Sequence, residues 1–236
     1  MPIGVIVNVT AVVLGGLVGS LMGNKLSQQL KDQMNAIMGL CALCMGIRAV
    51  VLMKNMPAVV FAVILGTLVG LVLKLGEAVR KGSALILNKV IAHQNPETDE
   101  LMLTAVVLFC ISGTGIYGAL DSGMTGNHSI LITKAVLDFF TAMIFACKLG
   151  KATAWIGIPQ SVVMLSLFAL AKVILPLTTP DMIADFKACG GFLLVATGLR
   201  IMQVKAFPVA DMIPAMLFVM PVSHIWSTWL LPLLQG

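Results

Sequence analysis

Charged side chains are scarce in this sequence. Only 11% of its 236 residues are Asp, Glu, Lys or Arg, whereas 59% are hydrophobic and the mean hydropathy is +1.03. A soluble domain carries about 25% charged and about 45–50% apolar residues. The charges are too few to cover a water-facing surface, which excludes a soluble globular protein and makes the lipid bilayer the expected surroundings.

The sequence also lacks the motifs of several functional classes. Its net charge of +5 comes from single basic residues between apolar segments, without a basic run interleaved with aromatics, so nucleic acid is not an expected partner. No HExxH, GxSxG, P-loop or GxGxxG motif is present, so we expect neither an enzyme nor a nucleotide cofactor. The histidines are isolated and the Cys41–Cys44 pair has no second pair, so no metal site is predicted.

Long apolar stretches predict an all-α, polytopic bundle of transmembrane helices, because about 20 apolar residues suffice to cross a bilayer. Eight segments qualify: 3–23, 34–53, 57–76, 101–119, 130–149, 156–176, 187–203 and 208–230. The last one contains three prolines and is expected to be kinked or re-entrant, which leaves seven spans as the alternative. Short connections favour a single domain over residues 1–236.

Residues 77–100 form a polar interruption between the third and fourth spans. Apolar residues such as Leu85 and Ile86 alternate with Arg80 and Lys81, which predicts a short amphipathic helix on the membrane surface. The segment 94–97 is expected to be the loop that ends this helix.

The distribution of Lys and Arg predicts the orientation. With eight spans and an outer N-terminus, ten of the 15 Lys and Arg residues fall on the inner side and five on the outer side. Cytoplasmic loops carry the excess of positive charge. Both termini are therefore predicted to lie outside, in the periplasm.

An internal repeat connects the second and seventh spans. Segment 39–48 resembles segment 191–200, and three positions match at one constant offset: Gly39 with Gly191, Gly46 with Gly198, and Arg48 with Arg200. Each copy is preceded by a polar connection, which contains Asp32 or Asp185. The alternative is a chance similarity between two Gly-rich apolar helices.

The repeat has a consequence for the architecture. The second and seventh spans run in opposite directions, so spans one to three (1–76) and six to eight (156–236) are predicted to be inverted repeats. They would flank the central spans within 101–149. Inverted repeats recur in secondary transporters.

Glycines recur at four-residue spacing in two spans: Gly15, Gly19 and Gly23 in the first, and Gly66 and Gly70 in the third. Small residues at this spacing let helix backbones approach closely in lipid. Either a homodimer or a contact within the chain would use these faces.

The fourth span changes character at Ser112. The stretch Ser112–Gly118 holds three glycines, and each Gly weakens a helix by about 1 kcal/mol relative to Ala. Irregular backbone at membrane depth survives where protein or a water-filled cavity satisfies its polar groups. We therefore predict a broken or re-entrant helix; an ordinary span that ends at residue 111 and continues as a loop is the alternative.

Asp138 lies inside the apolar run of the fifth span, four residues after Lys134, so the two can pair on one helix face. An ionisable residue within a span indicates a functional site by default. Asp138 is expected to couple to a proton or cation, with Lys134 holding its charge until substrate displaces it. A purely structural ion pair is the alternative.

Further candidate site residues surround this pair. Asn8 and Gln160 share the offset of the repeat and are expected to line a cavity, although such amides often only bond a neighbouring helix. Substrate contacts are expected from the broken span. The residues are Ser112, Gly113, Thr114, Gly115, Tyr117 and Asp121.

Several segments resemble the YqgA family of bacterial inner-membrane proteins. They are Asn8–Gly16, Phe109–Gly118, Gly123–Gly126, Lys134–Ala146 and Leu175–Pro180. The resemblance implies a polytopic protein of the bacterial cytoplasmic membrane. It supplies no function and no binding residues, because the family is one of unknown function. Asn127 departs from the expected pattern, in which Asp follows Gly126.

The leading hypothesis is a small secondary transporter or exporter of an ion or small solute. It depends on the inverted repeat, the broken fourth span and the buried charge of Asp138. The alternative is a non-transporting membrane scaffold or accessory subunit, in which the glycine faces mediate assembly and the Lys134–Asp138 pair is structural.

Overall fold

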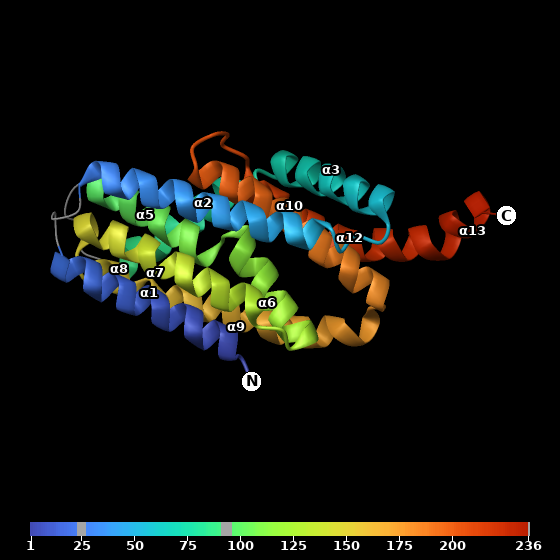
Figure 1. Ribbon diagram of the computed structural model, residues 1–236, viewed down its shortest axis with the longest axis horizontal. Coiled ribbons are helices and arrows are strands. Elements are labelled where there is room, and N and C mark those ends of the chain that lie inside the picture. The colour runs from blue at the N-terminus through green and yellow to red at the C-terminus, as the bar shows by residue number, and fades with distance from the viewer. Residues whose placement is uncertain (23–26, 91–95, 236) are drawn as a thin grey trace. The chain divides into compact units, whose positions relative to one another are not determined.

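The computed structural model describes residues 1–22, 27–90 and 96–235, and it describes the side chains of these residues except in 83–100 and 234–235. All regular secondary structure in these ranges is helical (Figure 1). The helices are α1 (Ile3–Met22), α2 (Gln28–Val50), α3 (Met56–Val72), α4 (Leu75–Val90), α5 (Pro96–Cys110), α6 (Gly113–Thr125), α7 (Ser129–Leu149), α8 (Ala152–Trp155), α9 (Gly157–Ile174), α10 (Pro180–Ile201), α11 (Val209–Met212), α12 (Pro214–Ile225) and α13 (Leu231–Gln235), with a 3₁₀ turn at Leu175–Leu177 and a π turn at Trp226–Leu230.

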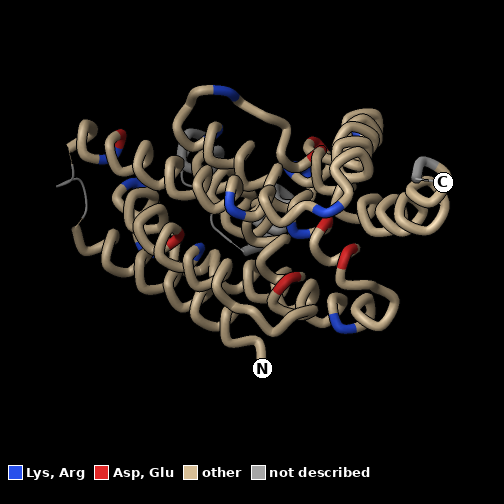
Figure 2. Tube along the Cα trace, turned by 45° about the vertical axis from the view of Figure 1, so that its right-hand side comes forward, with Lys and Arg blue, Asp and Glu red and all other residues tan. Residues whose placement is uncertain are grey.

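Seven helical stretches in the described residues are long and apolar enough to cross a membrane, and charged residues are sparse along them (Figure 2). They are Ile3–Met22, Gln28–Val50, Leu101–Thr125, Ser129–Leu149, Ala152–Leu177, Pro180–Ile201 and Val209–Leu233. Helix α3 and the start of α4 form an eighth candidate that is bent by 57°. The prediction of an all-α, polytopic bundle of seven or eight spans is confirmed.

The chain forms two compact units. The first consists of Met1–Met38 and Glu77–Val173, and the second consists of Gly39–Gly76 and Ile174–Gly236. Each unit therefore contains part of each predicted repeat: α1 and α9 belong to the first unit, whereas α3, α10 and α12 belong to the second.

In the first unit, glycines let α1 lie directly on the backbone of α7. A Cβ at Gly15 would lie 2.2 Å from the carbonyl oxygen of Phe139, and one at Gly19 would lie 2.2 Å from that of Met143. No side chain larger than hydrogen fits in either place. The predicted close approach of backbones at this stripe is thus made within the chain.

In the second unit, α3 uses its glycines in the same way. A Cβ at Gly66 would lie 2.3 Å from the backbone of Ala215 on α12, and one at Gly70 would lie 1.9 Å from the carbonyl oxygen of Asp211 on α11. The alternatives for the glycine faces were a homodimer and a contact within the chain. At these positions the glycines make a contact within the chain. Gly23 lies outside the described residues.

Helices α2 and α10 pack against each other at four glycines. A Cβ at Gly39 would lie 2.8 Å from the oxygen of Gly198, and one at Gly198 would lie 2.6 Å from the oxygen of Gly39. Gly46 and Gly191 face each other likewise, with distances of 2.7 and 2.8 Å to the opposite carbonyl oxygen. The contact is reciprocal: each copy of the repeated segment offers its two glycines to the other copy.

Several boundaries differ from those that hydropathy predicts. Helix α10 begins at Pro180, behind the N-cap Thr179, whose hydroxyl accepts a hydrogen bond from the N–H of Met182 at 3.3 Å. Asp185 is therefore inside a helix, and Asp32 is inside α2, so the prediction of polar connections at these residues is wrong. Hydropathy misplaced these helix boundaries, because polar residues inside a helix lower the local mean hydropathy without ending the helix.

The polar interruption contains helix α4, as predicted for its first part. The predicted loop at 94–97 lies largely outside the described residues, and helix α5 already begins at Pro96, which can occupy a first helical turn because its missing N–H has no partner there.

Candidate functional site

A buried ion pair lies on α7 in the first unit. The Nζ of Lys134 pairs with the Oδ2 of Asp138 one helical turn later. Lys134 is 3% exposed and Asp138 is 7% exposed. The predicted pair is thus formed, and both of its side chains are buried.

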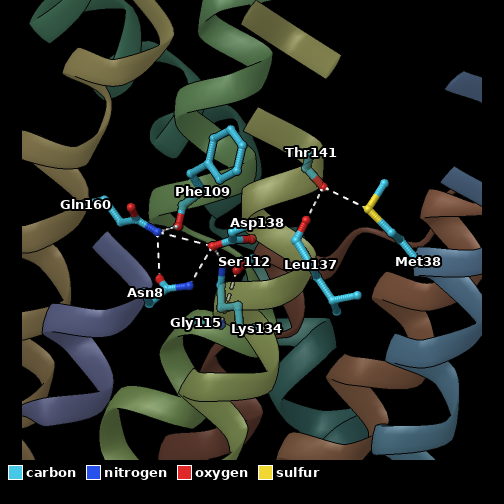
Figure 3. A network of polar contacts seen from close by, with 10 residues as sticks. All are labelled: Asn8, Met38, Phe109, Ser112, Gly115, Lys134, Leu137, Asp138, Thr141 and Gln160. Carbon is cyan, nitrogen blue, oxygen red and sulfur yellow. Dashed lines mark hydrogen bonds and ion pairs between the residues drawn. The ribbon is translucent and has the colours of Figure 1, made fainter. Parts of the chain in front are cut away.

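Two amide side chains from other helices donate hydrogen bonds to the same carboxylate oxygen (Figure 3). The Nδ2 of Asn8, on α1, donates to Asp138 Oδ2 at 2.9 Å. The Nε2 of Gln160, on α9, donates to this oxygen at 3.3 Å and to Asn8 Oδ1 at 2.8 Å. Asn8 and Gln160 are both completely buried. Side chains from three helices therefore converge on a single oxygen atom.

The fourth predicted span is broken between α5 and α6. Helix α5 ends at Cys110 and α6 begins at Gly113, with Ser112 as its N-cap. The hydroxyl of Ser112 accepts a hydrogen bond from the N–H of Gly115 at 3.1 Å. The chain therefore forms the predicted broken helix, and the alternative of a span followed by a loop is wrong because the glycine-rich stretch continues as a helix.

The broken ends of this span lie beside the ion pair. At the end of α5, the carbonyl oxygen of Phe109 is 3.4 Å from Gln160 Nε2. At the start of α6, a Cβ on Gly115 would lie 3.2 Å from Cε of Lys134. The Phe109 ring centroid is 6.0 Å from Lys134 Nζ. The absence of a side chain at Gly115 therefore leaves room for the lysine stem.

One buried acceptor atom of this network, Gln160 Oε1, has no hydrogen-bond partner among the described residues. The amide nitrogen of Gln160 donates to oxygens of Asn8, Phe109 and Asp138. The amide oxygen of Gln160 is therefore turned away from Asp138 (Figure 3). A buried acceptor without a partner costs about 1–3 kcal/mol. This arrangement is therefore unusual for a contact whose purpose is stability.

The structure brings together some of the predicted site residues and separates others. Asn8, Lys134, Asp138 and Gln160 form one hydrogen-bonded network, and Ser112 and Gly115 lie beside it (Figure 3). The remaining candidates are buried along α6 and are not part of the network drawn in Figure 3; they are Gly113, Thr114, Tyr117 and Asp121. The side chain of Asp121 accepts a hydrogen bond from Thr125 in its own helix at 3.2 Å.

The second unit has a polar cluster that sequence reasoning missed. Asp185 on α10 is completely buried. Its Oδ1 accepts hydrogen bonds from the N–H groups of Lys54 and Asn55 at 2.8 and 2.9 Å. Its Oδ2 accepts from Asn55 Nδ2 at 2.8 Å and from the Ser223 hydroxyl at 2.6 Å. Asp185 thus caps the N-terminus of α3 from a distant helix, a location that favours negative charge.

A cue for Asp185 was present in the sequence. Thr179 followed by Pro180 is a typical N-cap and first helical residue. Starting the helix there would have placed Asp185 in its second turn, where it needs buried partners. Which partners it has could not be read from the sequence, because they lie 131 residues upstream and 38 residues downstream.

In the described residues, no group of three or more His, Cys, Asp or Glu side chains could hold a metal ion. The Asp138 site instead offers one carboxylate, two amides, one ammonium and a main-chain carbonyl. These groups can bind a proton, a singly charged ion or a small hydrogen-bonding solute.

The helices and the buried polar site define this chain as a multi-pass integral membrane protein. The model of the family described as "Protein of unknown function (DUF554)" matches residues 3–224. The chain belongs to this family.

Two relatives have similar lengths. "Uncharacterized protein YqgA" of Escherichia coli (strain K12) is 48% identical over 235 residues, which cover 97% of this chain and 99% of the relative. "Uncharacterized membrane protein YdfK" of Bacillus subtilis (strain 168) is 26% identical over 224 residues, which cover 91% and 92%. No solved structure matches. The resemblance to the YqgA family is confirmed.

Proposed function

We propose that this protein is a small secondary transporter or exporter of an ion or small solute in the bacterial cytoplasmic membrane, and that Asp138 binds the coupling ion. One observation carries the proposal: a buried, charged pair meets two amides and a helix break at one carboxylate oxygen. Broken helices and intramembrane charges mark ion and substrate sites in transporters.

The energetics support a role beyond packing. A buried ion pair gives little stability, because the loss of hydration offsets the attraction between the charges, and apolar residues of similar volume often do as well or better. Lys134 and Asp138 are nevertheless surrounded by neutral amides rather than replaced by apolar side chains. A charge that binds and releases a ligand would explain this arrangement.

The predicted inverted repeat supports the same function. Asn8 and Gln160 occupy equivalent positions of the two predicted copies, and each donates to Asp138. The reciprocal glycine contacts between α2 and α10 are those that a two-fold relation between the copies would produce. In transporters built from inverted repeats, the site lies where the repeats meet.

Ion-jump measurements on proteoliposomes test the proposal. Charge movement on a solid-supported membrane, after steps in pH or in the concentration of small ions and metabolites, is expected for the wild type and lost in Asp138→Asn. Since this variant leaves Lys134 as an unpaired buried charge, Lys134→Gln combined with Asp138→Asn serves as a second, neutral variant. Asp32→Asn is the matched control, because Asp32 is exposed.

The same experiment distinguishes a transporter from the scaffold alternative. Three donors from the protein already bind Asp138 Oδ2, which favours a structural role for this carboxylate. A scaffold would give no charge movement in the wild type under any step. Asp138→Asn would then alter only stability or assembly.

A further inference from the structure

We propose that the Asp138 site binds a small zwitterionic α-amino acid. Its ammonium group takes the place of Lys134 on Asp138, and its carboxylate group pairs with Lys134 and with the first turn of α6. This inference rests on the proposed function and names the solute class of its site: the positive charge that Asp138 binds is the ammonium group of the solute. The inference follows from the charge balance of the ion pair and from the helix ends beside it.

The charge balance of the site excludes a ligand with a single charge. Lys134 and Asp138 pair directly and are both buried, so their charges cancel. A cation on Asp138 would leave Lys134 unpaired, and an anion on Lys134 would leave Asp138 unpaired. An unpaired charge is expensive inside a membrane-spanning segment. A zwitterion brings a partner for each charge at once, and it changes neither the net charge nor the protonation state of the pair.

The broken span places the negative end of a helix beside Asp138. Helix α5 ends at Cys110, and the carbonyl oxygen of Phe109 belongs to its last turn. This oxygen and Asp138 Oδ2 share one donor, the Nε2 of Gln160, at 3.4 and 3.3 Å. The carbonyl end of a helix carries a partial negative charge, which favours cations. The carboxylate therefore lies next to a helix end of its own sign, where an ammonium group is favoured.

Lys134 lies in the same way beside the positive end of α6. This helix begins at Gly113, and a Cβ on Gly115 would lie 3.2 Å from Cε of Lys134. The first N–H groups of a helix have no partner in their own helix, and the Ser112 hydroxyl takes that of Gly115. A carboxylate held by Lys134 would meet the N–H groups before it. In transporters with discontinuous helices, such N-terminal ends face the anionic groups of substrates.

The second unit shows how this chain holds a buried carboxylate without a lysine. Asn8 Nδ2 donates to Asp138 Oδ2 at 2.9 Å, and Asn55 Nδ2 donates to Asp185 Oδ2 at 2.8 Å, so the two carboxylates share one kind of contact. Asp185, however, accepts from main-chain N–H groups at the positive end of α3, and these are fixed. Asp138 is paired with a side chain, which can leave without unfolding a helix. Of these two carboxylates, Asp138 is therefore the one that can exchange its cation.

A buried acceptor without a donor points independently to a ligand with N–H groups. Gln160 is completely buried, its nitrogen donates to Asn8 and Asp138, and its Oε1 has no hydrogen-bond partner among the described residues. Such an acceptor marks a position for a donor from outside the chain. An ammonium group has three N–H donors, as in lysine, and Asp138 takes one of them. Neither amide has to turn over, because both nitrogens keep their contacts with Asp138.

The geometry of the pair limits the size of the ligand. Lys134 and Asp138 are in direct contact, so the two groups inserted between them have to be close together. The ammonium and carboxylate of an α-amino acid are bonded to one carbon atom and meet this condition. Space beside Lys134 comes from the missing side chain of Gly115, where a Cβ would also lie 2.9 Å from Cε of Met164. The site therefore suits glycine or alanine rather than an amino acid with a large side chain.

Binding to the purified full-length protein in detergent is the first test, and it does not require transport. Alanine should raise the unfolding temperature and give a saturable isotherm in titration calorimetry. Alaninamide keeps only the ammonium and propionate keeps only the carboxylate, so each should bind roughly 30-fold more weakly or worse, because one buried charge stays unpaired. γ-Aminobutyrate, whose charges are further apart, should also bind more weakly. Equal binding of alaninamide or propionate overturns the inference.

Variants locate the binding site. Asp138→Asn should abolish alanine binding, and the combination with Lys134→Gln, which leaves no unpaired charge, should do the same in a protein that keeps its fold. Gly115→Ala should weaken binding, because the methyl group fills the space beside Lys134. Gly82→Ala, which has no described atom within 4 Å of its Cβ, and exposed Asp32→Asn are the matched controls and should bind as the wild type does. Alanine binding that survives in the double variant overturns the inference.

Uptake into proteoliposomes is the second test. Alanine has no net charge, so its movement is followed with radiolabel, in counterflow against unlabelled alanine. The wild type should accumulate the label, and the double variant should match protein-free vesicles. If alanine does not bind while another ion or solute moves through Asp138, this inference fails and the proposed function stands. If alanine binds and neither it nor any other solute or ion moves, the ligand site stands and the proposed function fails.

Discussion

Asn8 and Gln160 are separated by 152 residues in the sequence, yet the amide nitrogen of Gln160 donates to the amide oxygen of Asn8 across 2.8 Å. Both residues also donate to Oδ2 of Asp138. The first helices of the two predicted repeats, α1 and α9, are therefore joined at the carboxylate of a central helix. This three-way contact is the centre of the proposed function.

Neutralising one member of the ion pair should be more harmful than neutralising both. Asp138→Asn should lower the free energy of unfolding by about 3–5 kcal/mol, because Lys134 remains as an uncompensated buried charge. The combination with Lys134→Gln should recover part of this loss. Denaturant titration in detergent, followed by circular dichroism, measures both. A double variant no more stable than the single one would contradict the prediction; exposed Asp32→Asn is the control.

The glycine contacts of α1 predict a steric effect. Gly19→Ala should cost about 1–3 kcal/mol of stability, because the added methyl group forces α1 away from the Met143 carbonyl and overpacks the contact. Gly82→Ala in α4 is the matched control. No described atom lies within 4 Å of its added Cβ, and replacing a helical Gly by Ala should gain roughly 0.5–1 kcal/mol. Equal effects at both positions would refute the close approach of α1 and α7.

Asp185 should be a stability residue rather than a transport residue. Asp185→Asn should lower the free energy of unfolding by about 3 kcal/mol, because hydrogen bonds to a charged group contribute roughly 1.5–3 kcal/mol each. Hydrogen exchange at Lys54 and Asn55 should rise in the same variant, since both N–H groups lose a charged acceptor.

The control for Asp185 is an acidic residue of the same helix. Asp181 lies exposed in the first turn of α10, so Asp181→Asn should cost about 0.3–1 kcal/mol through the helix dipole alone. Unchanged exchange at Lys54 in Asp185→Asn would show that the cap does not hold α3.

The orientation in the membrane is also testable. The excess of Lys and Arg on one side predicts that both termini lie in the periplasm. A C-terminal alkaline phosphatase fusion should therefore be active, and a C-terminal green fluorescent protein fusion should be dark. The opposite pattern would mean an odd number of spans or a reversed orientation.

Hydropathy was a reliable guide to the spans because each one must be apolar around its full circumference. It was least reliable at helix ends. Asp185 illustrates the reason: a carboxylate lowers the local hydropathy whether it sits in a loop or, as here, inside α10 with four protein donors. Local composition cannot distinguish these cases, since the donors come from distant segments.

The candidate site was predictable in part. Asp138 and Lys134 stood out because charge within a span is rare, and their pairing follows from helical geometry. Asn8 and Gln160 were related to each other by the offset of the repeat alone. The packing of α1, α5, α7 and α9 decided the other contacts. It brought both amides to one carboxylate oxygen and placed the Phe109 carbonyl where it accepts from Gln160.

The sequence by itself determined that this protein crosses the membrane several times, that its fourth span is interrupted by glycines, and that a charged pair is buried in its fifth. These properties follow from hydropathy, backbone propensity and residue spacing, all of which are local. The tertiary structure alone decided which glycines receive a neighbouring backbone, which helix end Asp185 caps and which side chains surround Asp138. Those outcomes depend on contacts between separate segments of the chain, such as the one between Asn8 and Asp138 across 130 residues, and such contacts are fixed by packing.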